Sequence, residues 1–528
     1  MPRSSWLTIG VALASLALGA RSDAAVRERM VGLGDLVPGN PDARFVSLGT
    51  LSITDDGTAV ILGRIRTWID DGRYPYEYGL WKWSPGLGLA RIPTPSLGQS
   101  VDPDRLAAAG NGRVVFAATD EAGVDRLFSC LVGNATADDC TTLATAGDTA
   151  LGMPDGWTLH HFAGVDLDAG GALSFSATID TPDPEAATGV FAYGDAATLV
   201  AATGDALSGA GTLAIGARND RVTGGGGTIA FTSSVPPEPA SPFDDSHEML
   251  VRWTAERGLE GLLVGDQPAP GFDEGATFAW PTRGLYIPPL GFDVAPDGTV
   301  AFAATTQTAG APDPGRGIWT CDPGAACELL VRDGDPLPDD AESAFAGFGD
   351  TTLSADGTLA VTATYAPVGA GSSERRIGVF TKRAGDMLRS CLRQGDRDPA
   401  GDPISGIYFI VSTGSGGRAV VNAFVEQWGA SDNRAAYACD PDGGIRTVMR
   451  TGDPLDPPEP AFVSAFDVIA TTADAAAEHV ALNVYGPDSL GPVLIYATLP
   501  ELGALAGAST ALVAIGAIAA GRRRLRAL

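Results

Sequence analysis

One short pattern returns eight times along the chain: a pair of turn residues followed by alternating apolar residues. The clearest copy, "FDVAPDGTVAFAAT", begins at Phe292, and the others recur roughly every 60 residues. An Asp-Gly, Asn-Gly or Gly-Gly pair suits the centre of a tight hairpin turn, where both residues need a positive φ. The pattern therefore predicts repeated β-hairpins. Their turn glycines are Gly57, Gly112, Gly171, Gly227, Gly298, Gly357 and Gly417, and the eighth copy carries Glu478 instead.

A third run follows each hairpin, and a fourth run closes most of the units. The third run ends in an aromatic or aliphatic pair, as in "GLWKW" and "GIWTC", and the fourth ends in Gly-Asp, as in "LVAATGD". The unit around residue 90 has "ARIPTPSLGQ" at this place, without the aspartate. Four short strands in each of seven or eight units predict an all-β chain, namely a β-propeller of about eight four-stranded blades. The tryptophans of the third strands, expected in the core between blades and not as sugar platforms, are Trp81, Trp83, Trp253 and Trp319.

The two ends of the repeat region complement each other. The last unit lacks a fourth strand, because "VLIYATLP" runs directly into residue 500, whereas "VRERMVGLGD" at residues 26–35 is a fourth strand with no unit before it. We expect residues 26–33 to pair with residues 492–497, which closes the ring and removes an exposed sheet edge. The propeller domain then covers residues 26–498.

Both termini have the form of targeting segments. Residues 1–24 combine Arg3, the apolar run "WLTIGVALASLALGA" and small residues near Ala20 or Ala24, which is typical of a secretory signal peptide. At the other end, Gly503 to Gly521 are apolar and would reach about 28 Å as a helix, close to the thickness of a bilayer. The arginines after this helix should stay in the cytoplasm. We therefore expect an exported protein anchored in the cell envelope by residues 499–528.

The C-terminal tail resembles the PEP-CTERM class of bacterial sorting signals, in which a Pro-Glu-Pro motif precedes a membrane helix and a basic end. Pro500 and Glu501 match the motif, Leu502 replaces its second proline, and the basic end is Arg522, Arg523 and Arg524. That resemblance implies processing by an exosortase. The alternative is a plain single-pass anchor.

The hairpins resemble the blades of the periplasmic Tol-system propeller. The whole pattern is similar to bacterial choice-of-anchor tandem-repeat proteins with an NxxGxxAF motif, although only Asn111 supplies the asparagine in a turn. This resemblance implies an exported, surface-displayed protein and no established activity.

The net charge limits which classes of partner the chain can bind, and the cysteines indicate the redox state of its compartment. Sixty-four acidic against 35 basic residues give a formal charge of -29, with Lys82 and Lys382 as the two lysines, so we expect no binding to nucleic acid. In an exported chain the cysteines are free to form disulfides. The positions of the cysteines within equivalent units predict the bonds Cys130–Cys140 and Cys321–Cys327, and leave a bond between Cys391 and Cys439 open.

The recurrent Gly-Asp turns place carboxylates on one face of the predicted ring, where they either bind cations or a basic partner or cap their own turns. We favour capping. These aspartates are Asp35, Asp148, Asp205, Asp266, Asp335, Asp396 and Asp453. We expect no cofactor, since "ITDDGTA" and "APDGTVA" each offer only one or two of the oxygen ligands that Ca²⁺ needs.

The sequence contains no convincing match to a catalytic motif. His160, His161, His247 and His479 have no spacing for zinc or a serine triad, and adjacent strand residues such as His160 and His161 point to opposite faces. "TGSGG" around Ser415 lacks the first glycine of a nucleophile elbow.

The sequence therefore favours a non-enzymatic binding or structural module of the cell surface or extracellular matrix, whose partner is a polysaccharide or a protein. The alternative is a secreted glycan-active enzyme, a hydrolase or lyase, with carboxylates about 5–10 Å apart across the central funnel. We name no catalytic or metal-binding residue from the sequence.

Overall fold

The structure is a computed structural model of the whole chain. It describes residues 26–500 with the exception of these internal positions: 55, 68–74, 96, 98–105, 109–111, 134–135, 151, 169–170, 183–186, 195, 208–210, 216–221, 236–246, 280–290, 309–314, 355, 372–373, 384, 414–417, 426–432, 441–443, 452, 454–464, 474–476 and 486–492. The predicted signal peptide (1–24) and the tail residues Glu501, Arg522, Arg523 and Arg524 lie outside the described residues, and Pro500 ends the last strand.

Eight antiparallel sheets of four or five strands, numbered here in chain order, make up most of the described residues. Sheets 1 to 4 contain β2 (Leu36–Val37), β3 (Asn40–Ile53), β4 (Ala59–Thr67), β5 (Tyr76–Ser84) and β6 (Gly88–Ile92); β7 (Leu106–Ala108), β8 (Arg113–Thr119), β9 (Asp125–Leu131) and β10 (Thr141–Thr145); β11 (Thr158–Leu167), β12 (Leu173–Asp180), β13 (Ala187–Tyr193) and β14 (Ala197–Ala202); and β17 (Val222–Gly225), β18 (Thr228–Val235), β19 (His247–Thr254) and β20 (Gly258–Leu263).

Sheets 5 to 8 contain β21 (Ala276–Phe278), β22 (Phe292–Val294), β23 (Val300–Thr308), β24 (Gly315–Cys321) and β25 (Glu328–Arg332); β26 (Pro336–Leu337), β27 (Asp340–Leu353), β28 (Leu359–Pro367), β29 (Arg376–Lys382) and β30 (Arg389–Arg393); β31 (Ile404–Thr413), β32 (Ala419–Val425), β33 (Arg434–Cys439) and β34 (Ile445–Arg450); and β35 (Ala465–Ala473), β36 (Ala477–Tyr485), β37 (Val493–Pro500) and β1 (Val26–Gly32). A small sheet of β15 (Ala206–Leu207) and β16 (Gly211–Thr212) and one 3-10 turn (Ala137–Asp139) complete the described elements.

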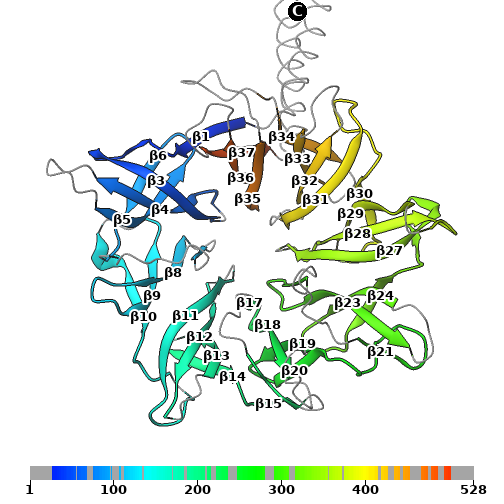
Figure 1. Cartoon of the computed structure of the whole chain (residues 1–528), viewed down its shortest axis with the longest axis horizontal. Helices are drawn as coiled ribbons and strands as arrows, with labels where there is room; N and C mark the ends of the chain where they lie inside the picture. Colours follow the sequence, from blue (N-terminus) through cyan, green and yellow to red (C-terminus); the bar gives the residue numbers. More distant parts are fainter. Residues whose placement is uncertain are drawn as a thin grey trace, which may run out of the picture.

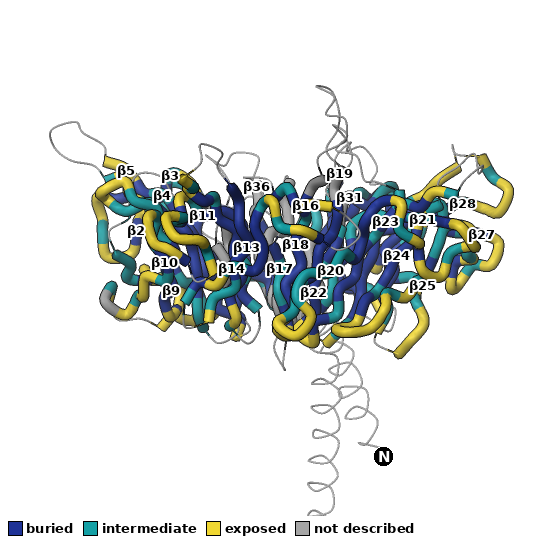
Figure 2. The backbone as a smooth tube through the Cα atoms, turned by 90° about the horizontal axis from the view of Figure 1, so that it is seen from below, coloured by how far each residue is buried: buried dark blue, intermediate teal, exposed yellow. Residues whose placement is uncertain are grey.

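The sheets follow one another around a common centre (Figure 1). Within a sheet, the first strand, such as β11 or β31, lies nearest the centre and the last strand, such as β14, lies near the rim. Seen after a turn of 90°, the sheets form a single flat layer (Figure 2). The described chain is therefore all-β and propeller-like, as the repeated pattern predicts.

The N-terminal strand supplies the outer strand of sheet 8. β1 pairs antiparallel with β37, from Val26 opposite Thr498 to Gly32 opposite Val493, and the strand order is β1-β37-β36-β35. The complementary ends of the repeat region thus meet in one sheet, in nearly the register that the sequence predicts. Residues more than 460 positions apart in the chain become neighbours by this pairing.

The hydrophobic core lies between neighbouring sheets. Val60 and Leu62 of sheet 1 pack with Phe116 of sheet 2, and the same kind of cluster recurs between the other sheets. Because strand side chains alternate between the two faces, one strand contributes to the clusters on both sides of its sheet. Trp81 and Trp319 are fully buried in these clusters, and Trp83 nearly so.

A glycine lies two residues before the buried aromatic residue in four of the third strands. A Cβ atom added to Gly79 would lie 2.8 Å from the ring of Trp81, and one added to Gly317 would lie 2.9 Å from the ring of Trp319. The ring therefore folds over the backbone of its own strand, which only glycine permits without strain. The four glycines are Gly79, Gly189, Gly317 and Gly378.

In the part of the chain that the structure covers, we find no helix of the length and apolarity needed to cross a bilayer.

Candidate functional site

The hairpin turns hold their glycines in the left-handed region. The φ values of these glycines lie between 72° and 85°, and Gly417 falls outside the described residues; the others are Gly57, Gly112, Gly171, Gly227, Gly298 and Gly357. The neighbouring carboxylates serve the same turns. Asp56 Oδ1 accepts the N–H of Thr58 at 3.1 Å, and Asp356 Oδ1 accepts the N–H of Thr358 at 3.0 Å. These aspartates stabilise turns and present no calcium-type ligand set.

The carboxylates of the Gly-Asp turns are also engaged locally. In six of the seven turns the Oδ2 atom accepts the backbone N–H of the residue three positions earlier, at 2.6–3.0 Å. The six are Asp35, Asp148, Asp205, Asp335, Asp396 and Asp453. The structure thus favours the capping role over a shared acidic binding ring.

In the turns at Gly34, Gly147, Gly334 and Gly395, the backbone attaches the end of one sheet to the beginning of the next. The N–H of Gly34 donates to the carbonyl of Phe45 at 2.8 Å, and the N–H of Phe45 donates to the carbonyl of Asp35 at 3.1 Å. Phe345 makes the same pair of bonds with Gly334 and Asp335. The recurrent motif is therefore a connector that fixes the angle between consecutive sheets.

Asp266 departs from the predicted capping role. Its φ is 65°, so it occupies the place that glycine has in the other turns, and Gln267 takes the place of the aspartate. The N–H of Asp266 donates to the carbonyl of Phe278, whose N–H donates to the carbonyl of Gln267. The turn is shifted by one residue, and the carboxylate of Asp266 instead accepts from Gln307 Nε2 at 2.8 Å.

All six cysteines form disulfides. Cys130–Cys140 and Cys321–Cys327 close turns in sheets 2 and 5, as the sequence predicts, with Cα atoms 4.2 and 4.1 Å apart. The bond that the sequence left open, Cys391–Cys439, is present and joins β30 of sheet 6 to β33 of sheet 7. One disulfide therefore crosses between sheets, and two stay within them.

Each disulfide-closed turn receives a cation from the preceding sheet. Lys82 Nζ donates to the carbonyl of Val132 at 2.7 Å, and the guanidinium of Arg252 donates to the carbonyls of Cys321 and Asp322 at 3.2 and 2.9 Å. Lys82 and Arg252 occupy equivalent positions, one residue before Trp83 and Trp253. These charges thus hold neighbouring sheets together.

The adjacent histidines contact different partners, although a register shift between Leu159 and His161 interrupts the predicted alternation there. His160 Nδ1 lies 3.0 Å from Asp180 Oδ2, whereas His161 Nδ1 contacts Asp125, which also accepts the hydroxyl of Thr119 at 2.7 Å. The two rings therefore do not bind one metal ion jointly. The side chains of His247 and His479, and Ser415, lie outside the described part of the chain.

Two carboxylates on central strands connect to the following sheet. Asp166 of β11 accepts the N–H of Gly224 at 2.8 Å, and Asp293 of β22 accepts the N–H of Leu353 at 2.7 Å. Each lies five residues before a turn glycine, so their places in the repeat are equivalent. Burial raises the pKa of Asp166 above its usual range, although the bond from Gly224 opposes this shift. Within the described residues no three His, Cys, Asp or Glu side chains gather to hold a metal ion.

Comparison with known sequences identifies one family. A family of unknown function (DUF7453) matches residues 109–481. The chain belongs to this family. No curated protein matches it. The match runs from β8 of sheet 2 to β35 and the first part of β36 in sheet 8, and leaves sheet 1, β7, β37 and β1 outside.

Comparison with solved structures gives matches of low identity and low TM-score. Polysaccharide lyase Uly1 is 13% identical with a TM-score of 0.35, over 79% of this chain and 93% of that one. An acylaminoacyl peptidase from Pyrococcus horikoshii is 9% identical with a TM-score of 0.37, over 83% of this chain and 57% of that one. A PL25 ulvan lyase is 9% identical with a TM-score of 0.29, over 78% and 96%. Similarity at this level carries no information about activity.

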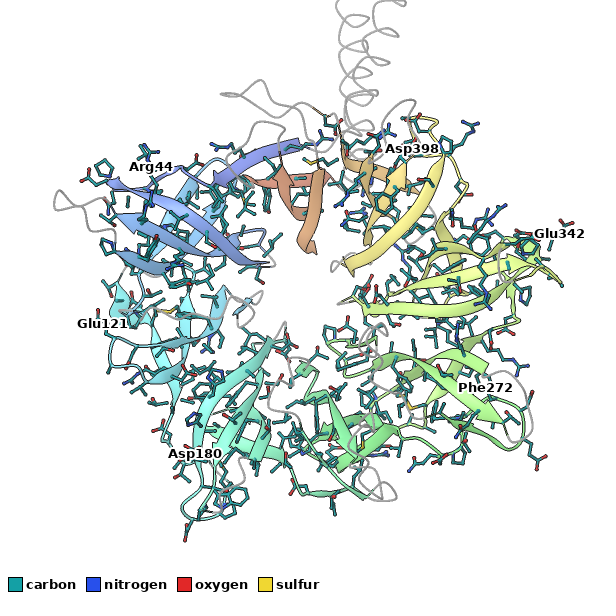
Figure 3. All side chains as sticks on the ribbon, in the orientation of Figure 1. Arg44, Glu121, Asp180, Phe272, Glu342 and Asp398 are labelled. Atoms are coloured by element: carbon teal, nitrogen blue, oxygen red, sulfur yellow. A yellow bond between two sulfur atoms is a disulfide. The ribbon has the colours of Figure 1, made fainter. Side chains whose placement is uncertain are left out.

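The described part of the DUF7453 chain contains buried polar networks that the sequence patterns do not indicate, and in one of them Arg418 and Arg446 both contact the buried carboxylate of Asp440. In sheet 7, the hydroxyl of Tyr437 donates to Asp398 at 2.7 Å, and Arg450 contacts Asp398 and Asp402 at 2.8 and 2.7 Å. Burial and the neighbouring Asp398 raise the pKa of Tyr437. Asp398 lies at the periphery of the ring (Figure 3), and its side chain is fully buried. The network around Asp398 therefore stabilises the rim, with the carboxylate of Asp402 partly exposed at its edge.

Proposed function

We propose that this DUF7453 chain is a closed eight-bladed β-propeller, exported and held at the cell surface, that acts as a binding or structural module of the envelope or extracellular matrix. The observation that carries the proposal is the use of its recurrent carboxylates. Six Gly-Asp aspartates cap their own turns, and Asp166 and Asp293 connect neighbouring sheets. Because these carboxylates form hydrogen bonds that make the fold rigid, they support a scaffold whose loops bind a polysaccharide or a protein.

Export is supported by the cysteines. Three disulfides stabilise a folded chain in an oxidising compartment and would not persist in a reducing cytosol. We propose that residues 1–24 direct export and that residues 499–528 anchor the chain, with Pro500 and Glu501 as part of a sorting signal. Replacing Arg522, Arg523 and Arg524 by glutamine should reduce membrane retention, which fractionation measures. Unchanged retention and topology would remove the role of these arginines.

A glycan-active enzyme is the second candidate, and one observation favours it. Burial raises the pKa of Asp166, a shift that general acids require, and Asp168 lies near enough to reinforce it. In this reading Asp166 donates a proton to a departing glycosidic oxygen. Its bond to Gly224 is the competing, structural use of the same carboxylate.

A glycan array combined with hydrolase and lyase assays on the full chain in detergent separates the two functions. The binding module predicts saturable binding without turnover, and the enzyme predicts turnover. Asp166→Asn keeps an oxygen that accepts from Gly224 and removes the proton, so turnover that disappears in this variant would replace the first proposal by the second. Asp293→Asn is the matched control, because it occupies the equivalent place in sheet 5.

A further inference from the structure

The outer part of one face of sheet 1 combines arginine and tyrosine side chains. On β4 and β5, Arg64 lies opposite Tyr78 and Arg66 lies opposite Tyr76. Because side chains alternate along a strand, these four residues share a face with Leu62 and Leu80. The two leucines are buried against sheet 2. The face thus changes from a buried apolar part to a part that carries cations and phenol rings.

Arg64 is held by the two tyrosines. The carbon atom of its guanidinium lies 4.1 Å from the ring centroid of Tyr76 and 5.6 Å from that of Tyr78. Tyr78 packs against the core between sheets 1 and 2, whereas Tyr76 is 45% exposed. Among the described residues no hydrogen-bond partner reaches the buried Nε atom of Arg64. The guanidinium is therefore pre-positioned by ring contacts alone.

Other arginines of this chain are matched to carboxylates. Arg126 pairs with Asp120 at 2.7 Å, Arg450 pairs with Asp398 at 2.8 Å, and Arg27 pairs with Asp453 at 2.8 Å. The chain has nearly twice as many acidic as basic residues, so a carboxylate partner is easily supplied. No carboxylate of the described residues forms an ion pair with Arg64. Within the described residues Arg64 is thus a half-buried cation without an anionic partner, which a negatively charged ligand would stabilise.

We propose that Arg64, Tyr76 and Tyr78 form a subsite for an anionic saccharide unit. A planar guanidinium binds a carboxylate or sulfate group through two parallel N–H bonds, and an exposed phenol ring packs against the apolar C–H face of a sugar. A uronate or a sulfated sugar offers both features in one residue. This inference rests on the proposed binding function and names its ligand class. Sheet 1 lies outside the residues that the DUF7453 family matches.

Titration calorimetry on the full chain in detergent tests the subsite. The probes are oligogalacturonate against maltooligosaccharide of equal length, and dextran sulfate against dextran, which separate carboxylate from sulfate recognition. We expect at least one anionic probe to bind saturably and about tenfold more tightly than its neutral counterpart. Arg64→Met should weaken that binding about tenfold, and Tyr76→Ala should weaken it about fivefold.

Arg91→Met is the matched control. Arg91 lies in the same sheet, opposite Trp81 and so on the other face, and it pairs with Glu77. This variant should bind the probes as the unchanged chain does. Arg64→Lys keeps the charge and loses the planar contact, so it should bind with intermediate affinity. If the Arg64→Met chain melts early, Arg64→Lys is the variant that tests the subsite.

Three results would overturn the subsite: no saturable binding of either anionic probe, equal affinity for neutral probes, or binding that Arg64 variants leave unchanged. These results differ from failure of the proposed function. Binding to a neutral glycan or a protein that Arg64→Met does not alter would keep the binding module and remove the subsite, whereas turnover of a polymer would remove the binding module itself.

Discussion

The junction of sheets 6 and 7 and the junction of sheets 8 and 1 are held in different ways. Cys391–Cys439 joins sheets 6 and 7 covalently, and the Asp398, Tyr437 and Arg450 network lies beside it. Sheets 8 and 1 meet through Tyr496, whose hydroxyl donates to the carbonyl of Gly57 and whose ring lies 4.6 Å from Trp83. Sheets 8 and 1 are joined by the backbone from β1 to β2 and by no disulfide, so the stability of their junction depends on β1 remaining paired with β37.

The largest effect is expected from removing β1. Deleting residues 26–33 exposes the edge of β37 and removes Met30 and Val31 from the core, which costs roughly 3–6 kcal/mol of the free energy of unfolding. Circular dichroism melts of the purified chain measure the loss. Deleting residues 309–314, which connect β23 and β24, is the control and should cost much less. Equal melting of both variants would mean that β1 contributes little to the junction.

The disulfides provide the next comparison. Cys391 and Cys439 are 48 residues apart, and Cys321 and Cys327 are 6 apart. The chain-entropy estimate gives a loss of about 4 kcal/mol when the first bond is removed and about 2 kcal/mol for the second. Replacing each pair by alanine and measuring urea unfolding checks the order. A larger loss for the shorter loop would show that local strain or packing outweighs the entropy of the unfolded chain.

The buried network beside the junction of sheets 6 and 7 can be compared with an exposed ion pair in sheet 1. Arg450→Met leaves the fully buried carboxylate of Asp398 without its cation, which should cost about 3 kcal/mol. Arg91→Met breaks the exposed pair with Glu77 and should cost less than about 1 kcal/mol. Denaturant unfolding compares the two variants. Similar losses in both would indicate that the network near Asp398 is hydrated and contributes no more than a surface pair.

The smallest expected effect concerns pH at the junction of sheets 8 and 1. Burial raises the pKa of Asp56, but bonds from Thr54 and Thr58 more than offset it and hold the pKa below 3.8. The folded pKa is therefore below the unfolded one, so the stabilisation is present above about pH 4 and is lost as the pH falls through the folded pKa. Asp56→Asn should melt earlier than the unchanged chain at pH 7, and the difference should shrink as the pH falls below 4. A difference that is the same at every pH would contradict this cause.

Short-range sequence patterns were enough to predict most of the fold. The turn glycines, the alternating apolar residues and the missing strand at one end predicted the hairpins and the pairing of β1 with β37, because these depend on short-range geometry and on simple strand counting. The bonds Cys130–Cys140 and Cys321–Cys327 were predictable for the same reason, since two equivalent units carry the same pair.

Other features depend on tertiary structure. "LLVGDQ" reads like the other Gly-Asp turns, and only the backbone reveals that Asp266 has moved into the glycine position. The bond Cys391–Cys439 needs the relative position of two sheets. The subsite at Arg64 requires knowing which face of sheet 1 extends beyond sheet 2, although the density of tyrosine and tryptophan around β5 was visible in the sequence.

The central claim is that the two ends of the repeat region close one ring, and hydrogen exchange of β1 in the intact chain tests it most directly. If β1 is a stable outer strand of sheet 8, the bonded amides of residues 27–32 should exchange as slowly as those of β37 and β36, because their opening then requires disruption of the junction. Exchange of residues 27–32 at the rate of an unstructured peptide, with β36 still protected, would contradict closure and leave an open array of sheets.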